Sequence, residues 1–319
     1  MSSALPYVIH QAEAERLLAQ IDVPQAMRGL FRALDAGQAV QPPQQLVEFP
    51  GAAGDFINYL GVLAGEGVYG IKTSPYIKCS EGPLVTAWTL LMSMASGQPL
   101  LLCDAGLLTV ARTAATTAVA IETLAPPGAT RLAVVGSGPV ARAHLNYVKG
   151  LRDWREIAVY SPNLALQMAN DRDSLCAIDS RIHIVDELAD AVADAAVIML
   201  CTSSAGPVLD PLSLGHAALI TSISTNAVRA HEVPPQSLAG MDVYCDYRAT
   251  TPGAAGEMLI ASERHGWSAA ELKGDLAELV GGRAPLPEYR RPVFFRSIGL
   301  GLEDVALANA LYHLYRQGL

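Results

Sequence analysis

The sequence lacks any concentration of positive charge. Its 22 Lys and Arg are outnumbered by 31 Asp and Glu, the formal net charge is -9, and no run of five or more basic residues occurs. A protein that follows a nucleic-acid backbone needs a basic patch or stripe. Nucleic-acid binding is therefore disfavoured.

Cysteine is also scarce. The five cysteines are scattered and form neither a Cys-x-x-Cys pair nor a Cys/His cluster, which predicts reduced thiols and no metal site.

The N-terminus does not show the basic segment and apolar run of a secretory signal, so a cytoplasmic location is expected. A Ser/His/Asp set, paired metal-binding histidines and a phosphate-binding Gly-Lys-Ser/Thr element are also missing.

Charged residues are absent between positions 82 and 103, as they are in a membrane span. The turn residues Ser96-Gly97-Gln98-Pro99 interrupt this stretch. We therefore expect two buried strands, residues 84–94 and 99–105, joined by a hairpin turn, and no membrane interaction.

What the sequence does contain is enough apolar material for a sizeable core and two domains, with 319 residues of which 51% are hydrophobic. Helical periodicity occurs at 11–20 and 24–36, and short β-rich runs follow at 44–49, 56–64 and 68–74. These predict a mixed α+β domain. A helix is then expected from Thr109, as its N-cap, to the stop at Pro126.

From Thr130 onward, apolar runs alternate with helical segments. The runs begin with RLAVVGSG, EIAVYSP and IHIVD and continue with AAVIMLCTS, ALITSIST and DVYCDYR. Because their apolar residues are continuous rather than alternating, they predict an α/β fold with a doubly wound parallel sheet. From about Phe294 the chain is expected to return to a helix that packs on the first domain.

The segment RLAVVGSGPVARAHL places Gly136, Gly138 and Ala141 in a G-x-G-x-x-A spacing between a strand and a helix. Gly136 would make the tight turn, Gly138 would let the backbone approach a pyrophosphate, and Ala141 would let helix and strand pack closely. The pattern indicates a Rossmann-type dinucleotide site whose turn also includes Ser137, Pro139 and Val140. The alternative is a purely structural turn.

Cofactor preference depends on the end of the next strand, where Ser161 stands in place of an aspartate or an arginine. Without an arginine for a 2′-phosphate, NAD(H) is favoured weakly over NADP(H). Thr202 and Ser203 end another strand, either beside the nicotinamide ribose or as an ordinary polar exit. The remaining predicted cofactor contacts are Thr116 and Ser297.

Two cations stand where charge is costly. Lys72 lies in the apolar run VYGIKTSPYI, so it either reaches solvent or meets an anion. If Thr109 caps its helix, Arg112 lies in the first turn, where a cation opposes the helix dipole at a cost of about 0.3–1 kcal/mol. A bound carboxylate would reverse that cost, and the alternative is a salt bridge to Asp104.

Asn226 follows the fifth of the apolar strands and is placed at the edge of the cofactor cleft, although strand ends favour asparagine for turns in any case. The neighbouring Arg229, His231 and Glu232 are expected to cap and solvate the next segment.

The order of VQPPQQ, GIKTSPYI, DAGLLTVARTAATTA, AVVGSGPVARAH and FFRSIGLGLEDVALA resembles the ornithine cyclodeaminase and mu-crystallin family over nearly the whole chain. This resemblance implies a substrate-binding and dimerisation domain (1–115 and 300–319), an NAD(P)-binding domain (116–299) and a homodimer. The family's two substrate-carboxylate cations match Lys72 and Arg112.

Two departures bear on the reaction. Asn226 stands where cyclodeaminases carry an assisting aspartate, and Gln44 or Gln45 replaces a further substrate-binding arginine. Both changes argue against ornithine cyclodeamination. What remains is hydride transfer to a 2-imino acid, with Lys72 supplying the imine proton and Asn226 orienting the nitrogen.

Residues 54–77 are similar to iminosuccinate reductases, so iminosuccinate, reduced to L-aspartate, is the expected substrate. Three alternatives stay open: a cyclic ketimine reductase, an alanine dehydrogenase-like activity, and a non-catalytic cofactor-binding protein.

Overall fold

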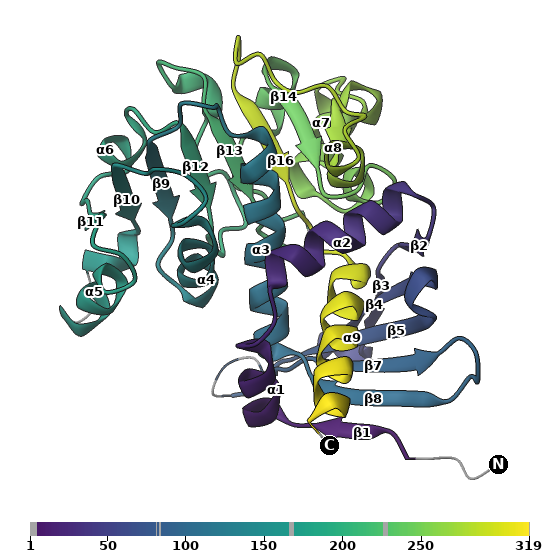
Figure 1. Ribbon diagram of the computed structural model, residues 1–319. Coiled ribbons are helices and arrows are strands. Elements are labelled where there is room, and N and C mark those ends of the chain that lie inside the picture. Colours follow the sequence, from purple (N-terminus) through teal and green to yellow (C-terminus); the bar gives the residue numbers. More distant parts are fainter. Residues whose placement is uncertain (1–4, 81, 83, 166–168, 226–228, 319) are drawn as a thin grey trace. The chain divides into compact units, whose positions relative to one another are not determined.

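The protein is described by a computed structural model that covers residues 5–80, 82, 84–165, 169–225 and 229–318 (Figure 1). The chain divides into two compact units. One, here called the terminal unit, consists of Met1–Arg112 with Gly299–Leu319; the other, the central unit, is Thr113–Ile298. Short 3-10 helices occur at Pro50–Ala52, Ala64–Glu66, Pro162–Ala165, Pro211–Ser213, Pro235–Gly240, Thr251–Gly253 and Ala269–Glu271.

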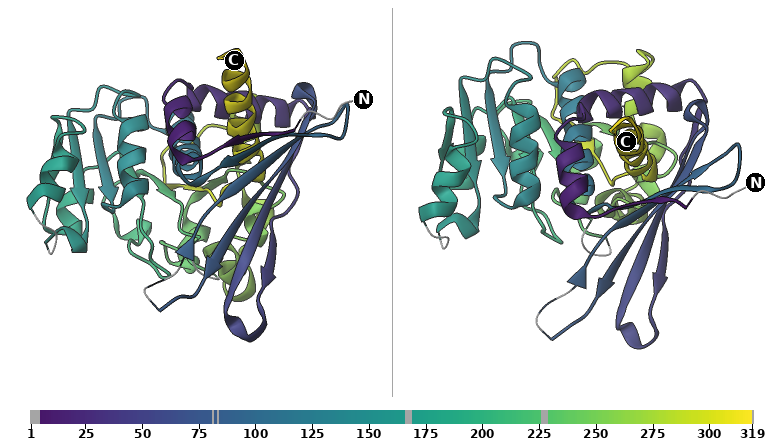
Figure 2. Two further views of the ribbon diagram at one scale, coloured as in Figure 1. Left: turned by 90° about the horizontal axis from the view of Figure 1, so that it is seen from below. Right: turned by 60° about the horizontal axis from the view of Figure 1, so that its bottom comes forward.

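The terminal unit is built on a mostly antiparallel sheet in the order β1-β8-β7-β5-β4-β2, with β3 paired to β4 and β6 to β5. Its strands are β1 (Tyr7–Ile9), β2 (Ala39–Val40), β3 (Gln45–Glu48), β4 (Gly54–Leu63), β5 (Val68–Ile77), β6 (Leu84–Val85), β7 (Trp88–Ser93) and β8 (Pro99–Asp104). Its helices are α1 (Gln11–Leu18), α2 (Val23–Asp35) and α9 (Gly301–Gln317). Figure 2 shows these three helices together on one face of the sheet.

A pair of glycines lets α9 lie directly on this sheet. Gly61 of β4 and Gly70 of β5 face each other in register. A Cβ on Gly61 would come within 2.9 Å of the Leu302 backbone nitrogen, and one on Gly70 within 2.7 Å of a Val305 methyl. Side chains at these positions would push the helix off the sheet, so the glycines fix where the first turn of α9 lies.

The hairpin of the sequence prediction is present but its first strand is broken. Residues 84–94 form β6 and β7 rather than one strand, because the backbone leaves the ladder between them. There the Thr86 carbonyl accepts a hydrogen bond from Ser74 Oγ (2.8 Å) and the Ala87 carbonyl one from the Ala105 N–H (2.8 Å).

The long helix α3 (Gly106–Leu124) begins three residues before the predicted cap. Asp104 accepts the backbone N–H of Gly106 at 3.0 Å, while the Thr109 hydroxyl donates back to the Ala105 carbonyl at 2.8 Å. The prediction that Thr109 caps the helix was therefore wrong. Arg112 lies in the second turn, where the dipole effect has already fallen off. Among the described residues α3 alone is long and apolar enough to cross a membrane, and most of it is buried inside the protein, as in a core helix.

The central unit carries the predicted doubly wound sheet, all parallel, in the order β11-β10-β9-β12-β13-β16-β14-β15. The strands are β9 (Arg131–Val135), β10 (Glu156–Tyr160), β11 (Ile182–Ile184), β12 (Val197–Leu200), β13 (Leu219–Ser222), β14 (Asp242–Cys245), β15 (Gly274–Asp275) and β16 (Val293–Arg296). Its helices, besides α3, are α4 (Pro139–Val148), α5 (Ala169–Cys176), α6 (Leu188–Val192), α7 (Gly256–Arg264) and α8 (Leu276–Val280). Every residue of β12, β13 and β16 is buried, as expected of strands covered on both faces.

Two strands of this sheet were missed, the two-residue β15 and the longer β16. Residues after Phe294 were predicted to return to a helix, whereas Val293–Arg296 first forms β16. This strand inserts between β13 and β14, which are consecutive in the chain, and pairs with both. Four residues give too short a pattern to separate a buried strand from the start of a helix.

Candidate active site

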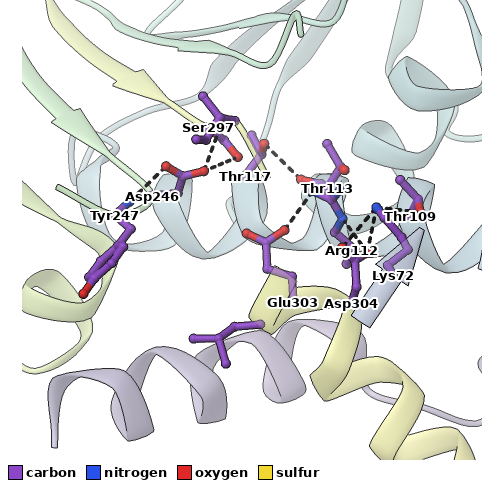
Figure 3. Close-up of polar contacts among 12 residues, drawn as sticks. Lys72, Thr109, Arg112, Thr113, Thr117, Asp246, Tyr247, Ser297, Glu303 and Asp304 are labelled. Atoms are coloured by element: carbon purple, nitrogen blue, oxygen red, sulfur yellow. Dashed lines mark hydrogen bonds and ion pairs between the residues drawn. The ribbon is translucent and has the colours of Figure 1, made fainter. Parts of the chain in front are cut away.

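Two buried cations of the terminal unit meet on one carboxylate (Figure 3). Lys72 Nζ of β5 lies 3.1 and 3.0 Å from the two oxygens of Asp304, and Arg112 Nε of α3 lies 3.2 Å from Asp304 Oδ1. All three side chains are almost fully buried: Lys72 is 2% exposed, Arg112 4% and Asp304 1%. The structure thus brings together the two cations that the sequence singled out, on a partner that it did not.

A second carboxylate completes the cluster. Glu303, which precedes Asp304 in the first turn of α9, accepts a hydrogen bond from Arg112 Nη1 at 2.9 Å. The helix dipole favours both acids at this helix N-terminus. Two positive and two negative side chains therefore balance in a buried cluster, which offsets the large cost of burying any one of them alone. The predicted alternative for Arg112, a salt bridge, is present, but to these acids and not to Asp104.

Two further groups lie close to the Lys72 ammonium. Its ammonium lies 4.2 Å from the centre of the Tyr59 ring on β4 and 3.3 Å from the Thr109 hydroxyl. Burial lowers the pKa of Lys72 to about 8; Asp304 opposes this shift and Arg112 adds to it. A lysine so placed can give up its proton near neutral pH.

The charge on Arg112 is permanent by contrast. Burial acts to lower its pKa, but the charges of Asp304 and Glu303 outweigh burial and raise the pKa above its usual value. A glycine packs against its guanidinium: Gly299 has φ +78°, and a Cβ there would lie 2.0 Å from Arg112 Nη1. This position therefore requires glycine both for its backbone conformation and for the space that Arg112 fills.

The predicted dinucleotide turn has the expected geometry. Gly136 has φ +128°, and a Cβ on it would lie 2.4 Å from the Cys201 carbonyl oxygen of the neighbouring strand end. Gly138 is the N-cap of α4, with no side-chain cap bond, and a Cβ on it would have nothing within 4 Å. Ala141, in the first turn of α4, is fully buried. Gly136 is thus required by the fold, and Gly138 leaves open space at the helix N-terminus.

These features fit a dinucleotide. The N-terminal N–H groups of α4 are not met by a capping side chain, and such groups bind phosphate. Thr116 in α3 has a fully buried hydroxyl without a hydrogen-bond partner among the described residues, so it is available to a ligand. Ser161 follows β10, at the carboxyl end where the ribose lies in such folds, and is 8% exposed. In the turn itself, Ser137 is buried, Val140 is half-buried and Pro139 is exposed.

Glu232 corrects another prediction. Instead of facing solvent, its carboxylate is fully buried and accepts hydrogen bonds from residues at the carboxyl ends of β12 and β13. It accepts hydrogen bonds from Thr202 N (2.9 Å) and Oγ1 (2.6 Å), Ser222 Oγ (2.8 Å), Ile223 N (3.0 Å) and Ser224 N (3.1 Å). Thr202 is therefore held by the protein, while Ser203 beside it is exposed.

Ser297 belongs to a second buried carboxylate network, at the carboxyl ends of β14 and β16 (Figure 3). Its hydroxyl donates to Asp246 Oδ2 at 3.1 Å, and the Ile298 N–H donates to the same oxygen at 2.7 Å. The Tyr247 N–H meets Asp246 Oδ1 at 2.9 Å, and the Thr251 hydroxyl donates there too. The network fixes the chain where it leaves β16.

Gln44 and Gln45, the other predicted substrate contacts that the structure describes, are not brought to the cation pair. Gln44 and Gln45 are exposed, and the register pairs Gln45 with Asn58, which alternates with Tyr59 and so lies on the sheet face opposite Lys72. Asn226 lies outside the described residues. Arg229 is exposed and pairs with Glu263 at 2.5 Å.

Sequence reasoning missed Asp304, Glu303 and Tyr59. One signal was available for the two acids. Adjacent carboxylates open an otherwise apolar helix in GLGLEDVALA, which is unusual unless they meet buried cations. The sequence offers no comparable sign for Tyr59, which reaches Lys72 only through the register of β4 and β5.

A parallel sheet with a glycine-rich turn at the N-terminus of one helix is the arrangement by which Rossmann-type folds bind dinucleotides. The model of the ornithine cyclodeaminase/mu-crystallin family matches residues 6–318. The chain belongs to this family. It is an NAD(P)-dependent oxidoreductase acting on the CH–NH2 or C=N group of amino or imino acids.

Among curated relatives, the chain is 68% identical over 318 residues, covering 100% of both chains, to the NAD(P)H-dependent anabolic L-arginine dehydrogenase DauB of Pseudomonas aeruginosa. Two solved structures share the fold. Thermococcus litoralis Δ1-pyrroline-2-carboxylate reductase with NADH and L-proline has a TM-score of 0.88, with 21% identity and coverage of 98% of each chain. Paracoccus denitrificans iminosuccinate reductase with NAD+ also has a TM-score of 0.88, with 22% identity and coverage of 98% and 97%.

Proposed function

We propose that this protein reduces a 2-imino acid to the L-amino acid, with Arg112 and Lys72 holding the substrate carboxylate. The observation that carries the proposal is the convergence of these two buried cations on one carboxylate. We further propose that the substrate is the imine of 5-guanidino-2-oxopentanoate and the product L-arginine. The support is the 68% identity, over the full length, to an anabolic L-arginine dehydrogenase.

Arg112 retains donors for a substrate. Of the five N–H groups of a guanidinium, one meets Asp304 and one meets Glu303. The other N–H groups can grip a carboxylate in the bidentate manner that arginine favours. Lys72, with its pKa of about 8, can donate a proton to the imine nitrogen.

The reduced nicotinamide, when bound, supplies the hydride that adds to the α-carbon while the imine nitrogen takes a proton. On this chain the turn from Gly136 to Ala141 and the hydroxyls of Thr116 and Ser161 would hold the cofactor. We propose NADH over NADPH, because residues 161–170 contain no Lys or Arg for a 2′-phosphate. Comparable kcat/KM values for the two cofactors would contradict this preference.

The sheet face that bears Lys72 leads to an acidic side chain. Lys72 pairs with Tyr59 in register, and Asp55 lies four residues back along β4, on the same face. Burial raises the pKa of Tyr59, the charge of Arg112 lowers it, and the charges of Asp304 and Asp55 raise it further. The carboxylate of Asp55 therefore acts electrostatically on the Tyr59 hydroxyl. An extended guanidino substrate anchored at Arg112 would therefore find a carboxylate along this face.

A panel of oxo acids with ammonia and NADH tests the substrate. We expect the highest kcat/KM with 5-guanidino-2-oxopentanoate, and NAD+-dependent oxidation of L-arginine in the reverse direction. Oxaloacetate, pyruvate, 2-oxoglutarate and a cyclic imine serve as rivals in the same assay. Preference for oxaloacetate would favour iminosuccinate instead, and NADH binding without turnover of any compound would favour a cofactor-binding protein.

Replacing Asp55 with asparagine should lower kcat/KM for the guanidino substrate about 10- to 100-fold and leave pyruvate reduction unchanged, because a charged hydrogen bond contributes about 1.5–3 kcal/mol. Glu48→Gln is the matched control, since Glu48 pairs with Asp55 in register but is exposed. Equal losses for both substrates, or for both variants, would remove Asp55 from side-chain recognition.

We also propose a cytoplasmic homodimer formed through the terminal unit. The five cysteines are free, as in a reducing compartment. Apolar side chains on β3 and β6 are about half exposed: Leu46 49%, Val47 54%, Leu84 51% and Val85 60%. Sedimentation as a single species of monomer mass would contradict the dimer.

A further inference from the structure

The carboxylate of Asp304 contacts both buried cations of the terminal unit. Its Oδ1 accepts from both Lys72 Nζ (3.1 Å) and Arg112 Nε (3.2 Å), while Oδ2 lies 3.0 Å from Lys72 Nζ. Glu303, the neighbouring acid, is paired with Arg112 at 2.9 Å. Lys72 and Arg112 therefore share Asp304.

The backbone leaves Asp304 little freedom to move. A Cβ on Gly301 at the start of α9 would lie 2.2 Å from the Leu60 carbonyl oxygen, so the helix begins in close contact with β4. The Leu302 N–H donates to Gln41 Oε1 at 3.0 Å, which fixes the same turn from another side. Asp304 is thus held by packing and hydrogen bonding of the turn that carries it, as pre-organised sites require.

We propose that Asp304 is the positioning residue of the imine reduction: it holds the Lys72 ammonium and the Arg112 guanidinium side by side, so that both bind the substrate carboxylate while Lys72 also faces the imine nitrogen. This inference rests on the proposed function and adds to it a residue that acts through two others. Asp304 is 1% exposed, so it acts from behind the cations and not as a ligand of substrate.

The same contact keeps Lys72 charged. The groups that face its ammonium are Asp304 and Glu303 on α9, Arg112 on α3 and Tyr59 on β4, and the thiol of Cys103 on β8 lies within the field of Asp304. Of these, Asp304 most strongly opposes the burial that lowers the pKa of Lys72. Without this carboxylate the pKa of Lys72 falls further below about 8, and the proton is lost at a lower pH.

The direction of the pH effect follows. Imine protonation needs the charged lysine, so activity of the unmodified enzyme should decline as pH rises through about 8. In Asp304→Asn this decline should begin at lower pH. We expect kcat/KM to fall about 100-fold at pH 8 and by less at pH 6, since acidification restores the proton.

The experiment measures kcat and KM from pH 6 to 9.5 with the guanidino oxo acid, ammonia and NADH, for the unmodified enzyme and three variants. Glu303→Gln is the matched control: it removes the same charge from the adjacent residue, whose carboxylate pairs with Arg112. It should raise KM and move the decline to lower pH by less than Asp304→Asn does, because Glu303 raises the pKa of Lys72 less strongly than Asp304 does. Asp304→Glu keeps the charge but moves the carboxylate, so it should keep the pH of the decline and raise KM.

Each outcome decides the proposal. An active Asp304→Asn enzyme with the unmodified pH profile overturns it, as does an equal pH shift in Glu303→Gln. Should Asp304→Asn not fold, judged by thermal unfolding and NADH fluorescence titration, Asp304→Glu carries the test, and unmodified KM in that variant overturns the positioning role. Failure of the proposed function is distinguishable, because the unmodified enzyme would then reduce no imine at any pH, which would overturn both.

Discussion

Replacing Lys72 with methionine should lower kcat for imine reduction about 1000-fold, within the range that a positioned proton donor contributes. Methionine keeps most of the buried aliphatic volume against Tyr59 but removes the ammonium that lies 3.0 Å from Asp304. The dissociation constant for NADH should stay nearly unchanged, because the dinucleotide turn belongs to the central unit and Lys72 to the terminal unit.

Stopped-flow hydride transfer and fluorescence titration of NADH check this result separately. Lys78→Met is the control, because it makes the same replacement at an exposed site one residue beyond β5. Some loss of stability is expected in Lys72→Met, since it leaves two carboxylates with one cation. Loss of NADH binding, or full turnover, in a folded Lys72→Met enzyme would contradict the role given to this lysine.

Alanine at the two glycines of the dinucleotide turn should have opposite effects. In Gly136→Ala the free energy of unfolding should fall by about 2–4 kcal/mol, because φ is +128° and the new Cβ meets the Cys201 carbonyl at 2.4 Å. In Gly138→Ala stability should hardly change, since nothing lies within 4 Å. Its KM for NADH should nevertheless rise about 10-fold or more, because a methyl group would obstruct the approach of the pyrophosphate.

Thermal and urea unfolding give the stability of both variants, and NADH titration gives their cofactor affinity. The comparison shows which glycine of the turn is needed for stability and which is needed for binding the cofactor. Unchanged NADH affinity in Gly138→Ala would show that the pyrophosphate does not bind against this residue. The turn would then have a structural role only.

The features that could be predicted from the sequence are those with a local pattern. Continuous apolar runs predicted the parallel sheet, and the spacing of Gly136, Gly138 and Ala141 predicted a turn whose geometry the structure confirms. Lys72 was noticed because a lysine inside an apolar run is rare, and that exception marks a buried cluster.

The features that were missed depend on distant parts of the chain. Asp304 is 232 residues from Lys72, and no local pattern can relate them. The start of α3 was misplaced because threonine is a common cap by residue type, while the Thr109 hydroxyl bonds back to Ala105 inside the helix. Glu232 was expected to be solvated because a charged residue after a strand usually is, yet five donors from β12, β13 and their ends surround it.

The split composition of the terminal unit has a consequence for biosynthesis. The strand that carries Lys72 is made early, but the acids that neutralise the cations lie on α9, where Asp304 follows Lys72 by 232 residues. The central unit is contiguous in the chain and can fold as it emerges. The nascent terminal unit must keep two uncompensated cations and the glycine-lined surface of β4 and β5 exposed until α9 has been synthesised. Premature termination near residue 300 should therefore yield a protein with an intact dinucleotide unit and an aggregation-prone, inactive sheet.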